Sequence, residues 1–188
     1  MVDWLIHIDR ELMLFLNGFH SPFFDFIMWW ISDRFIWTPL YLLILVLFIR
    51  KFKSLAFWPI LITLMAVAMS DFFSAHIIKE GIHRLRPTYD PVIGQLVHTV
   101  HGYTGGLYGF VSSHAANTFA LATMSYLFIR SQPLTIFIFA WAIFVSYSRI
   151  YLGVHYPADV FCGALFGSLL ALVLYFIWLK IPFLHPTR

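Results

Sequence analysis

Five long runs of apolar residues, separated by more polar stretches of different lengths, dominate the chain. They cover residues 35–49, 55–78, 115–129, 134–147 and 158–179. Crossing about 30 Å of hydrocarbon takes roughly 20 helical residues, so the first, third and fourth runs need tilt or neighbouring residues to complete a crossing. The pattern predicts an all-α integral membrane protein with about five transmembrane helices in a compact bundle.

The first 20 residues follow a different pattern. Apolar side chains recur there at helical spacing, and polar or charged side chains occupy the other side. The apolar set is Trp4, Leu5, Ile8, Leu12, Phe15, Leu16 and Phe19, and the polar set is Asp3, His7, Arg10 and Glu11. This predicts an interfacial amphipathic helix over residues 1–20. Residues 22–34 either extend the first span or form a separate short helix, because Asp33 and Arg34 interrupt the apolar pattern.

Composition supports a membrane-embedded chain. Of the 188 residues, 61% are hydrophobic and only 11% are charged, whereas an ordinary soluble domain has about 45–50% apolar and about 25% charged residues. We therefore expect one membrane domain over residues 1–188, with the bilayer as its main partner. The net charge of +3 comes without a basic block, so no nucleic-acid partner is expected, and no protein partner is indicated.

The basic residues of the loops predict an orientation. One set falls on a single side of the predicted bundle: Arg50, Lys51, Lys53, Arg130, Lys180 and Arg188. The positive-inside rule makes that side cytoplasmic. The other side carries as many basic residues, so the orientation depends on several of them being held in a site. With those residues held in a site, the charge distribution predicts a multi-pass protein of the cell inner membrane with its active site on the outer face.

Three clusters of ionisable residues lie at predicted helix ends on that outer face. They occupy residues 79–87, 112–114 and 148–159. Pro87 ends regular helix in the first cluster. Because the second and third spans, and the fourth and fifth, are joined on the outer side, a compact bundle brings the clusters into one pocket.

The pocket is predicted to bind phosphate. Lys79, Arg86 and Arg149 carry positive charges that are costly near a membrane unless paired or functional. Arginine offers planar, paired donors to phosphate oxygens, and Ser112 and Ser113 at a helix start add donors and the positive end of the helix dipole. Acidic metal ligands are scarce nearby, so we expect no metal and no cofactor.

Two histidines complete the predicted chemistry. Pro157 suits the first position of a helix, which places Asp159 in the first turn, within reach of His155. A carboxylate bonded to one imidazole nitrogen leaves the other free to attack phosphorus. His114 is positioned to protonate the departing oxygen.

These residues resemble a known family. The spacings Lys-x6-Arg-Pro, Ser-x-His and Ser-Arg-x5-His-x3-Asp are similar to the three-part signature of the type 2 phosphatidic acid phosphatases, integral-membrane lipid phosphatases whose site is shared with vanadium haloperoxidases. The resemblance covers about residues 55–180, the predicted phosphatase core. The middle motif departs from the family's usual Pro-Ser-Gly-His, because this chain has Val111-Ser112-Ser113-His114.

The resemblance implies a role for each motif residue. Lys79, Arg86 and Arg149 would bind phosphate, and Ser113 would still offer its backbone N–H. His155 would be the nucleophile that forms a phosphohistidine, with Asp159 as its orienting partner and His114 as the acid.

The expected activity is hydrolysis of a lipid phosphate or diphosphate at the outer leaflet. Undecaprenyl diphosphate, converted to undecaprenyl phosphate, is the first choice because the chain resembles the small bacterial members of the family. Phosphatidylglycerol phosphate, phosphatidic acid and a lipid A phosphate remain open as substrates.

Two functions of other classes are weaker alternatives. A haem-binding electron carrier would need histidines facing each other within the spans, but His114 and His155 lie at predicted helix ends. An anion transporter would show broken helices or repeats around a midplane site, and Lys79 and Arg86 taken alone would suit interfacial anchors.

Asp71, inside the second span, is expected to hydrogen-bond a polar group of the bundle. The glycine-rich segment 102–110 suits a mobile lid or lipid-facing flap.

Overall fold

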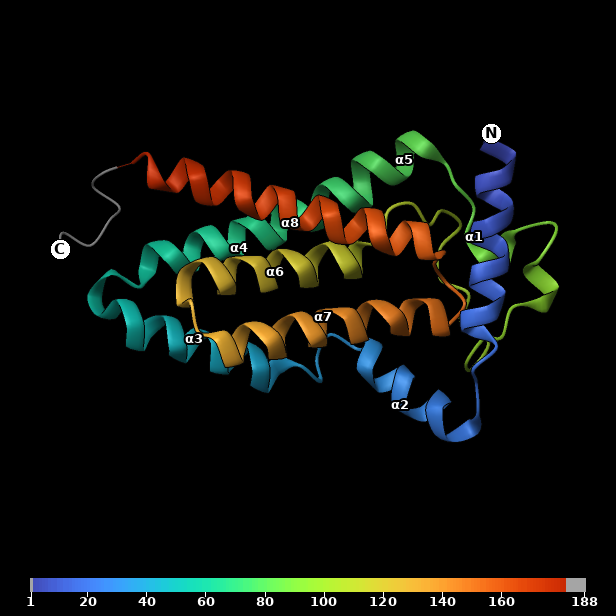
Figure 1. The fold of residues 1–188 in the computed structure, drawn as a ribbon, viewed down its shortest axis with the longest axis horizontal. Coiled ribbons are helices and arrows are strands. Elements are labelled where there is room, and N and C mark those ends of the chain that lie inside the picture. The colour runs from blue at the N-terminus through green and yellow to red at the C-terminus, as the bar shows by residue number, and fades with distance from the viewer. Residues whose placement is uncertain (1, 182–188) are drawn as a thin grey trace.

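The structure, a computed structural model, describes residues 2–181 as an assembly of helices. Long helices run along one axis, and shorter elements and loops gather at one end (Figure 1). In chain order the elements are α1 (Val2–Asn17), α2 (Pro22–Ser32), α3 (Thr38–Phe52), η1 (Lys53–Leu55), α4 (Phe57–Phe72), η2 (Phe73–Ile78), α5 (Lys79–Ile82), η3 (Pro87–Tyr89), η4 (Gly94–Leu96), α6 (Ser113–Ile129), α7 (Gln132–Tyr151) and α8 (Pro157–Leu179). The predicted all-α architecture is confirmed.

Among residues 2–181, three helical stretches are long and apolar enough to cross a membrane. They are α4 through α5 as one 26-residue stretch, α7 with 20 residues and α8 with 23 residues. Helices α3 and α6 have 15 and 17 residues, which is less than the roughly 20 residues of a perpendicular crossing. A membrane protein is therefore supported, and the count of five spans stays a prediction.

Residues 22–34 do not extend the first span. They form the separate helix α2, which begins at Pro22 and is capped by Ser21, whose side chain accepts from the Phe24 backbone N–H. The helix ends where Asp33 takes an extended conformation. Of the two alternatives left open by the sequence, the separate short helix is the one observed.

Helix α6 packs closely against α8, and this contact joins two of the three predicted motifs. Both helices begin at the end of the bundle where the loops gather (Figure 1). Gly163 and Gly167 of α8 face the carbonyl oxygens of Ser112 and Ala116, so closely that a Cβ atom at either glycine would overlap them. Small residues allow such an approach of two backbones in a membrane bundle. The Ser112 N–H also donates to the Asp159 carbonyl at 3.0 Å.

The α6–α8 contact predicts a large stability effect at Gly167. A Gly167→Ala substitution places a methyl group against the Ala116 carbonyl, and we expect it to lower the free energy of unfolding by about 3 kcal/mol. Gly81→Ala is the matched control, because a Cβ at Gly81 meets nothing within 4 Å. Thermal unfolding of both variants in detergent measures the difference. Equal unfolding temperatures would contradict this packing.

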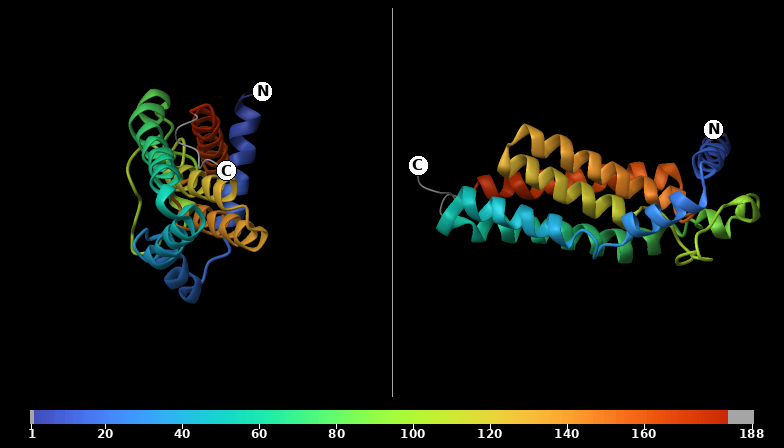
Figure 2. Two further views of the ribbon diagram at one scale, coloured as in Figure 1. Left: turned by 90° about the vertical axis from the view of Figure 1, so that its left-hand side faces the viewer. Right: turned by 90° about the horizontal axis from the view of Figure 1, so that it is seen from below.

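Helix α1 lies across the end of the bundle, near the loops that connect α5 to α6 (Figures 1 and 2). Its inward side carries Asp9, Met13 and Asn17, which are buried, whereas Trp4 and Phe15 are exposed. The apolar stripe therefore points away from the protein, as an interfacial helix requires. The helix ends at Asn17, within the predicted range of residues 1–20.

Candidate active site

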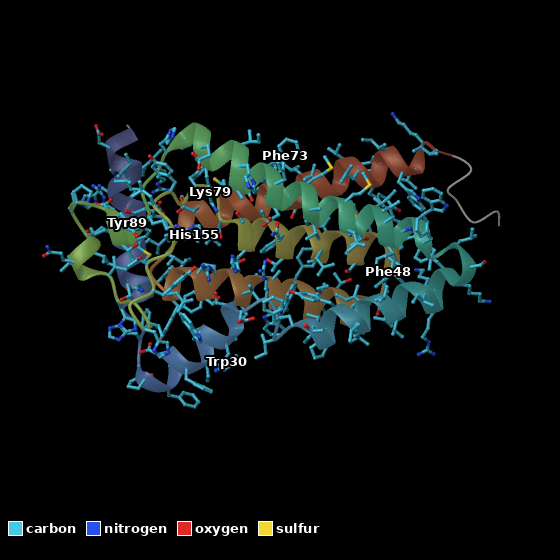
Figure 3. The ribbon with its side chains drawn as sticks, turned by 180° about the vertical axis from the view of Figure 1, so that it is seen from behind. Trp30, Phe48, Phe73, Lys79, Tyr89 and His155 are labelled. Atoms are coloured by element: carbon cyan, nitrogen blue, oxygen red, sulfur yellow. The ribbon has the colours of Figure 1, made fainter. Side chains whose placement is uncertain are left out.

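A cavity of about 670 Å³ lies at the end of the bundle where the loops gather. Three segments that are distant in sequence contribute to its wall, and Figure 3 shows Lys79 and His155 near one another at this end. The cavity is lined by six of the eight predicted site residues, namely Lys79, Arg86, Ser113, His114, Arg149 and His155. The structure thus brings the three motifs together.

His155 occupies the turn between α7 and α8 and is only 2% exposed. Arg86 Nη1 lies 3.4 Å from its Nε2. Because a guanidinium only donates hydrogen bonds, this contact favours the tautomer with the proton on Nδ1 and a lone pair on Nε2, where it accepts from Arg86. Nδ1 faces Asp159 Oδ2 at 3.6 Å, which is longer than a hydrogen bond. Asp159 is completely buried behind the ring.

Burial strongly affects the ionisation of His155. Loss of solvent, followed by the charges of Arg86, Arg149 and Lys79, holds the pKa of His155 well below its ordinary value. The ring is therefore neutral at pH 7. A neutral imidazole keeps the lone pair that a nucleophile needs.

The three cations around His155 are fixed by neutral groups. Arg86 Nε donates to the Tyr108 carbonyl at 3.1 Å, and Lys79 Nζ donates to Ser113 Oγ at 2.9 Å. Arg149 donates to Ser32 Oγ and, at 3.3 Å, to the Tyr103 hydroxyl. None of the ion pairs formed between residues 2–181 includes Lys79, Arg86 or Arg149. Unpaired positive charge of this kind suits a bound anion.

Ser112 and Asp159 are the predicted site residues that do not line the cavity. Ser112 is fully buried as the N-cap of α6, where its Oγ accepts from the Ala115 N–H at 3.5 Å. Both its side chain and its N–H are thus occupied within the protein. Its phosphate-binding role is not supported by this geometry, whereas Ser113 and His114 in the first turn of α6 remain candidates.

The comparisons with known proteins identify the family. The sequence profile described as the PAP2 superfamily matches residues 56–182. The chain belongs to the PAP2 superfamily. The phosphatase expected from the three motifs is therefore confirmed at the level of the family.

Curated relatives match most of the chain. A protein named lipid A 4′-phosphatase from Bacteroides thetaiotaomicron is 38% identical over 94% of this chain and 80% of its own length. A second protein of that name, from Porphyromonas gingivalis, is 32% identical over 95% of this chain and 76% of its own length.

A solved PAP2 structure shares the fold. The transmembrane PAP2-type phosphatidylglycerolphosphate phosphatase of Bacillus subtilis superposes with a TM-score of 0.71 and 23% identity, covering 94% of this chain and 87% of the other.

Sequence reasoning missed Arg84 of this PAP2 protein. Its Nη1 donates to Asp159 Oδ1 at 2.7 Å, and its Nη2 donates to Asp9 Oδ2 at 2.6 Å. The guanidinium also lies 4.2 Å from the centre of the Tyr156 ring. Arg84 therefore holds the carboxylate behind His155. The sequence offered one signal for Arg84, its position two residues before Arg86. No sequence feature near Asp9 identifies Asp9 as the partner of Arg84.

Two further expectations have structural outcomes. Asp71 was expected to bond a polar group, and this is confirmed because Asn117 Nδ2 donates to its Oδ1 at 2.8 Å. The 102–110 segment, expected to be a lid or flap, is hydrogen-bonded to the site: Arg86 N–H donates to the Leu107 carbonyl at 3.0 Å. At Gly105 the φ is +68°, and a Cβ would lie 2.7 Å from Arg86 Nη1. Glycine is needed there to bring the loop against Arg86.

Proposed function

We propose that this lipid phosphatase hydrolyses a phosphate monoester of lipid A through a phosphohistidine on His155. The observation that carries the proposal is the cavity in which a buried, neutral His155 faces three cations that have no carboxylate partner. Such a pocket stabilises a phosphate and the charge that develops on it during transfer.

The reaction has two steps. His155 Nε2 attacks phosphorus, the bond from phosphorus to the lipid oxygen breaks, and His114 gives that oxygen a proton. Water then attacks the phosphohistidine, His114 takes a proton from the water, and inorganic phosphate leaves as the bond to Nε2 breaks. Lys79, Arg86 and Arg149 hold the phosphate oxygens in both steps, and Asp159 holds the imidazole in its orientation.

The shape of the cavity supports an amphiphilic substrate. A second, apolar cavity of about 310 Å³ lies among α3, α4, α6 and α7. The two cavities have lining residues in common, namely Tyr41, Val67, Asn117, Thr118 and Trp141. A phosphate bound near His155 therefore has an apolar space beside it, and this space suits the hydrocarbon tail of a lipid substrate.

The relatives favour lipid A among the candidate lipids. The two proteins named lipid A 4′-phosphatase match 94% and 95% of this chain. We therefore place the 4′-phosphate of lipid A ahead of undecaprenyl diphosphate, the first choice from the sequence alone. Undecaprenyl diphosphate stays a prediction to be tested in parallel.

We also propose five membrane crossings with the site on the outer face of the inner membrane. The crossings are α3, α4 through α5, α6, α7 and α8, with the shorter helices tilted or extended by their neighbours. Lys51 donates to the Ile129 carbonyl at 2.7 Å, and Arg130 donates to the Tyr175 hydroxyl at 3.2 Å. These basic residues lie at the end of the bundle away from the site, which supports a cytoplasmic position for that end.

Phosphate release from purified protein tests the function. We expect release from lipid A to exceed release from undecaprenyl diphosphate, phosphatidylglycerol phosphate and phosphatidic acid. Activity should persist in EDTA, because three basic side chains supply the positive charge that Mg²⁺ supplies in many phosphoryl-transfer enzymes. Faster release from undecaprenyl diphosphate would overturn the substrate, and activity that needs a divalent ion would overturn the cationic mechanism.

A further inference from the structure

The 670 Å³ cavity that His155 lines is called the phosphate cavity below. Asp71 and Asn117 lie where it meets the apolar cavity of about 310 Å³. Both line the phosphate cavity, and Asn117 lines the apolar one as well. Asp71 precedes Lys79 by eight residues in the continuous helical stretch Phe57–Ile82, which corresponds to about 12 Å at 1.5 Å per residue. The pair therefore lies deeper in the bundle than the cations that face His155.

The pair leaves one buried hydrogen-bond acceptor without a partner among residues 2–181. Asn117 donates from Nδ2 to Asp71 Oδ1 at 2.8 Å, and the carboxylate fixes this amide orientation because it only accepts. Asn117 Oδ1 is buried and has no hydrogen-bond partner among residues 2–181. A buried acceptor in this state costs free energy unless a ligand supplies a donor.

The charge of Asp71 is also unusual in its position. It lies within a stretch apolar enough to cross a membrane, and none of the ion pairs between the described residues includes it. Within residues 2–181, its carboxylate accepts a hydrogen bond only from the neutral amide of Asn117. Carboxylates inside membrane spans are costly, and those that face a cavity mark substrate pathways.

The position of the pair relative to His114 indicates which part of a substrate it meets. Asn117 follows His114 by three residues on α6, so both side chains lie on one face of the helix, about 4.5 Å apart along its axis. If His114 protonates the oxygen that leaves, Asn117 lies next to the head group that carries this oxygen. The apolar cavity begins at the same residue.

We propose that Asp71 and Asn117 form a recognition site for hydrogen-bond donors of the lipid head group. The class of substrate is a phosphate monoester on a head group with hydroxyl or amide N–H groups, such as a phosphorylated glycolipid. The carboxylate of Asp71 repels a second phosphate at this position, so the site disfavours lipid diphosphates. This inference rests on the proposed function and specifies its substrate.

The test compares substrates that differ in head-group donors. Phosphate release is measured for wild type, Asp71→Asn and Asp71→Leu with lipid A, phosphatidic acid and undecaprenyl diphosphate. Phosphatidic acid has no hydroxyl or amide beside its phosphate. We expect Asp71→Leu to lower kcat/KM for lipid A at least tenfold, to change that for phosphatidic acid less than threefold, and to raise that for the diphosphate.

Two controls separate recognition from folding. Glu80→Gln removes an exposed acid of the same helical stretch that does not line the cavity, and it should leave all three values unchanged. If Asp71→Leu does not fold, Asp71→Asn keeps the shape and removes the charge, and its relative rate with the diphosphate should still rise. An equal loss with every substrate, or no change in their ratios, would overturn the inference. If wild type does not hydrolyse lipid A, but Asp71→Leu still changes kcat/KM for phosphatidic acid less than threefold and raises it for the diphosphate, only the proposed substrate is overturned.

Discussion

Replacing His155 with alanine is expected to slow phosphate release by about 10³-fold or more, because the substitution removes the attacking nitrogen. The bundle should remain folded. His155 lies in a turn outside the helices, and without its ring Asp159 still accepts from the Tyr156 N–H and from Arg84 Nη1. Phosphate release from lipid A, together with thermal unfolding in detergent, measures both effects.

The control for this variant is His76→Ala, which removes an exposed histidine that does not line the cavity. It should keep wild-type activity. A folded His155→Ala protein with more than a few per cent of wild-type activity would show that another group attacks phosphorus.

The second large effect is expected at Arg84. The Arg84→Met substitution leaves the fully buried Asp159 without its ion-pair partner, and it also frees Asp9 of α1. Loss of a buried pair costs about 3–5 kcal/mol, and we expect about 2 kcal/mol here because the Arg84 side chain is 25% exposed and solvent screens part of the interaction. Misplacement of Asp159 and His155 should lower kcat by about 10²-fold.

A comparison of kcat with KM distinguishes positioning from phosphate binding. Arg84 does not line the cavity, so KM should change little while kcat falls. Arg50→Met is the matched control, because Arg50 is exposed near the end of α3, away from the site. A rise in KM with an unchanged kcat would show that Arg84 binds substrate and does not hold Asp159.

Local patterns in the sequence predicted much of the fold. The apolar runs located the long helices because burial in a membrane requires continuous hydrophobic surface. Pro157 fixed the start of α8, and the four-residue spacing from His155 to Asp159 places both side chains together. The separate helix α2 was left open, since its independence depends on how α3 starts after Asp33.

Contacts between distant segments could not be predicted from the sequence. Asp9 and Arg84 pair across 75 residues, and Asn117 meets Asp71 across 46 residues. Neither pair has a local spacing that identifies its partner. Ser112 was predicted to bind phosphate because it precedes a helix, but the same position makes it the N-cap, and capping occupies its side chain. The close approach at Gly167 likewise depends on how α6 meets α8.

Detection of the covalent intermediate tests the central claim most directly. Purified protein is mixed with lipid A labelled with ³²P at the 4′ position and quenched in alkali, in which phosphohistidine survives, and the labelled peptide is then sequenced by mass spectrometry. We predict phosphate on His155, and no label in His155→Ala. Phosphate on His114 or on a serine, or turnover by wild type with no labelled protein at any quench time, would contradict His155 as the nucleophile.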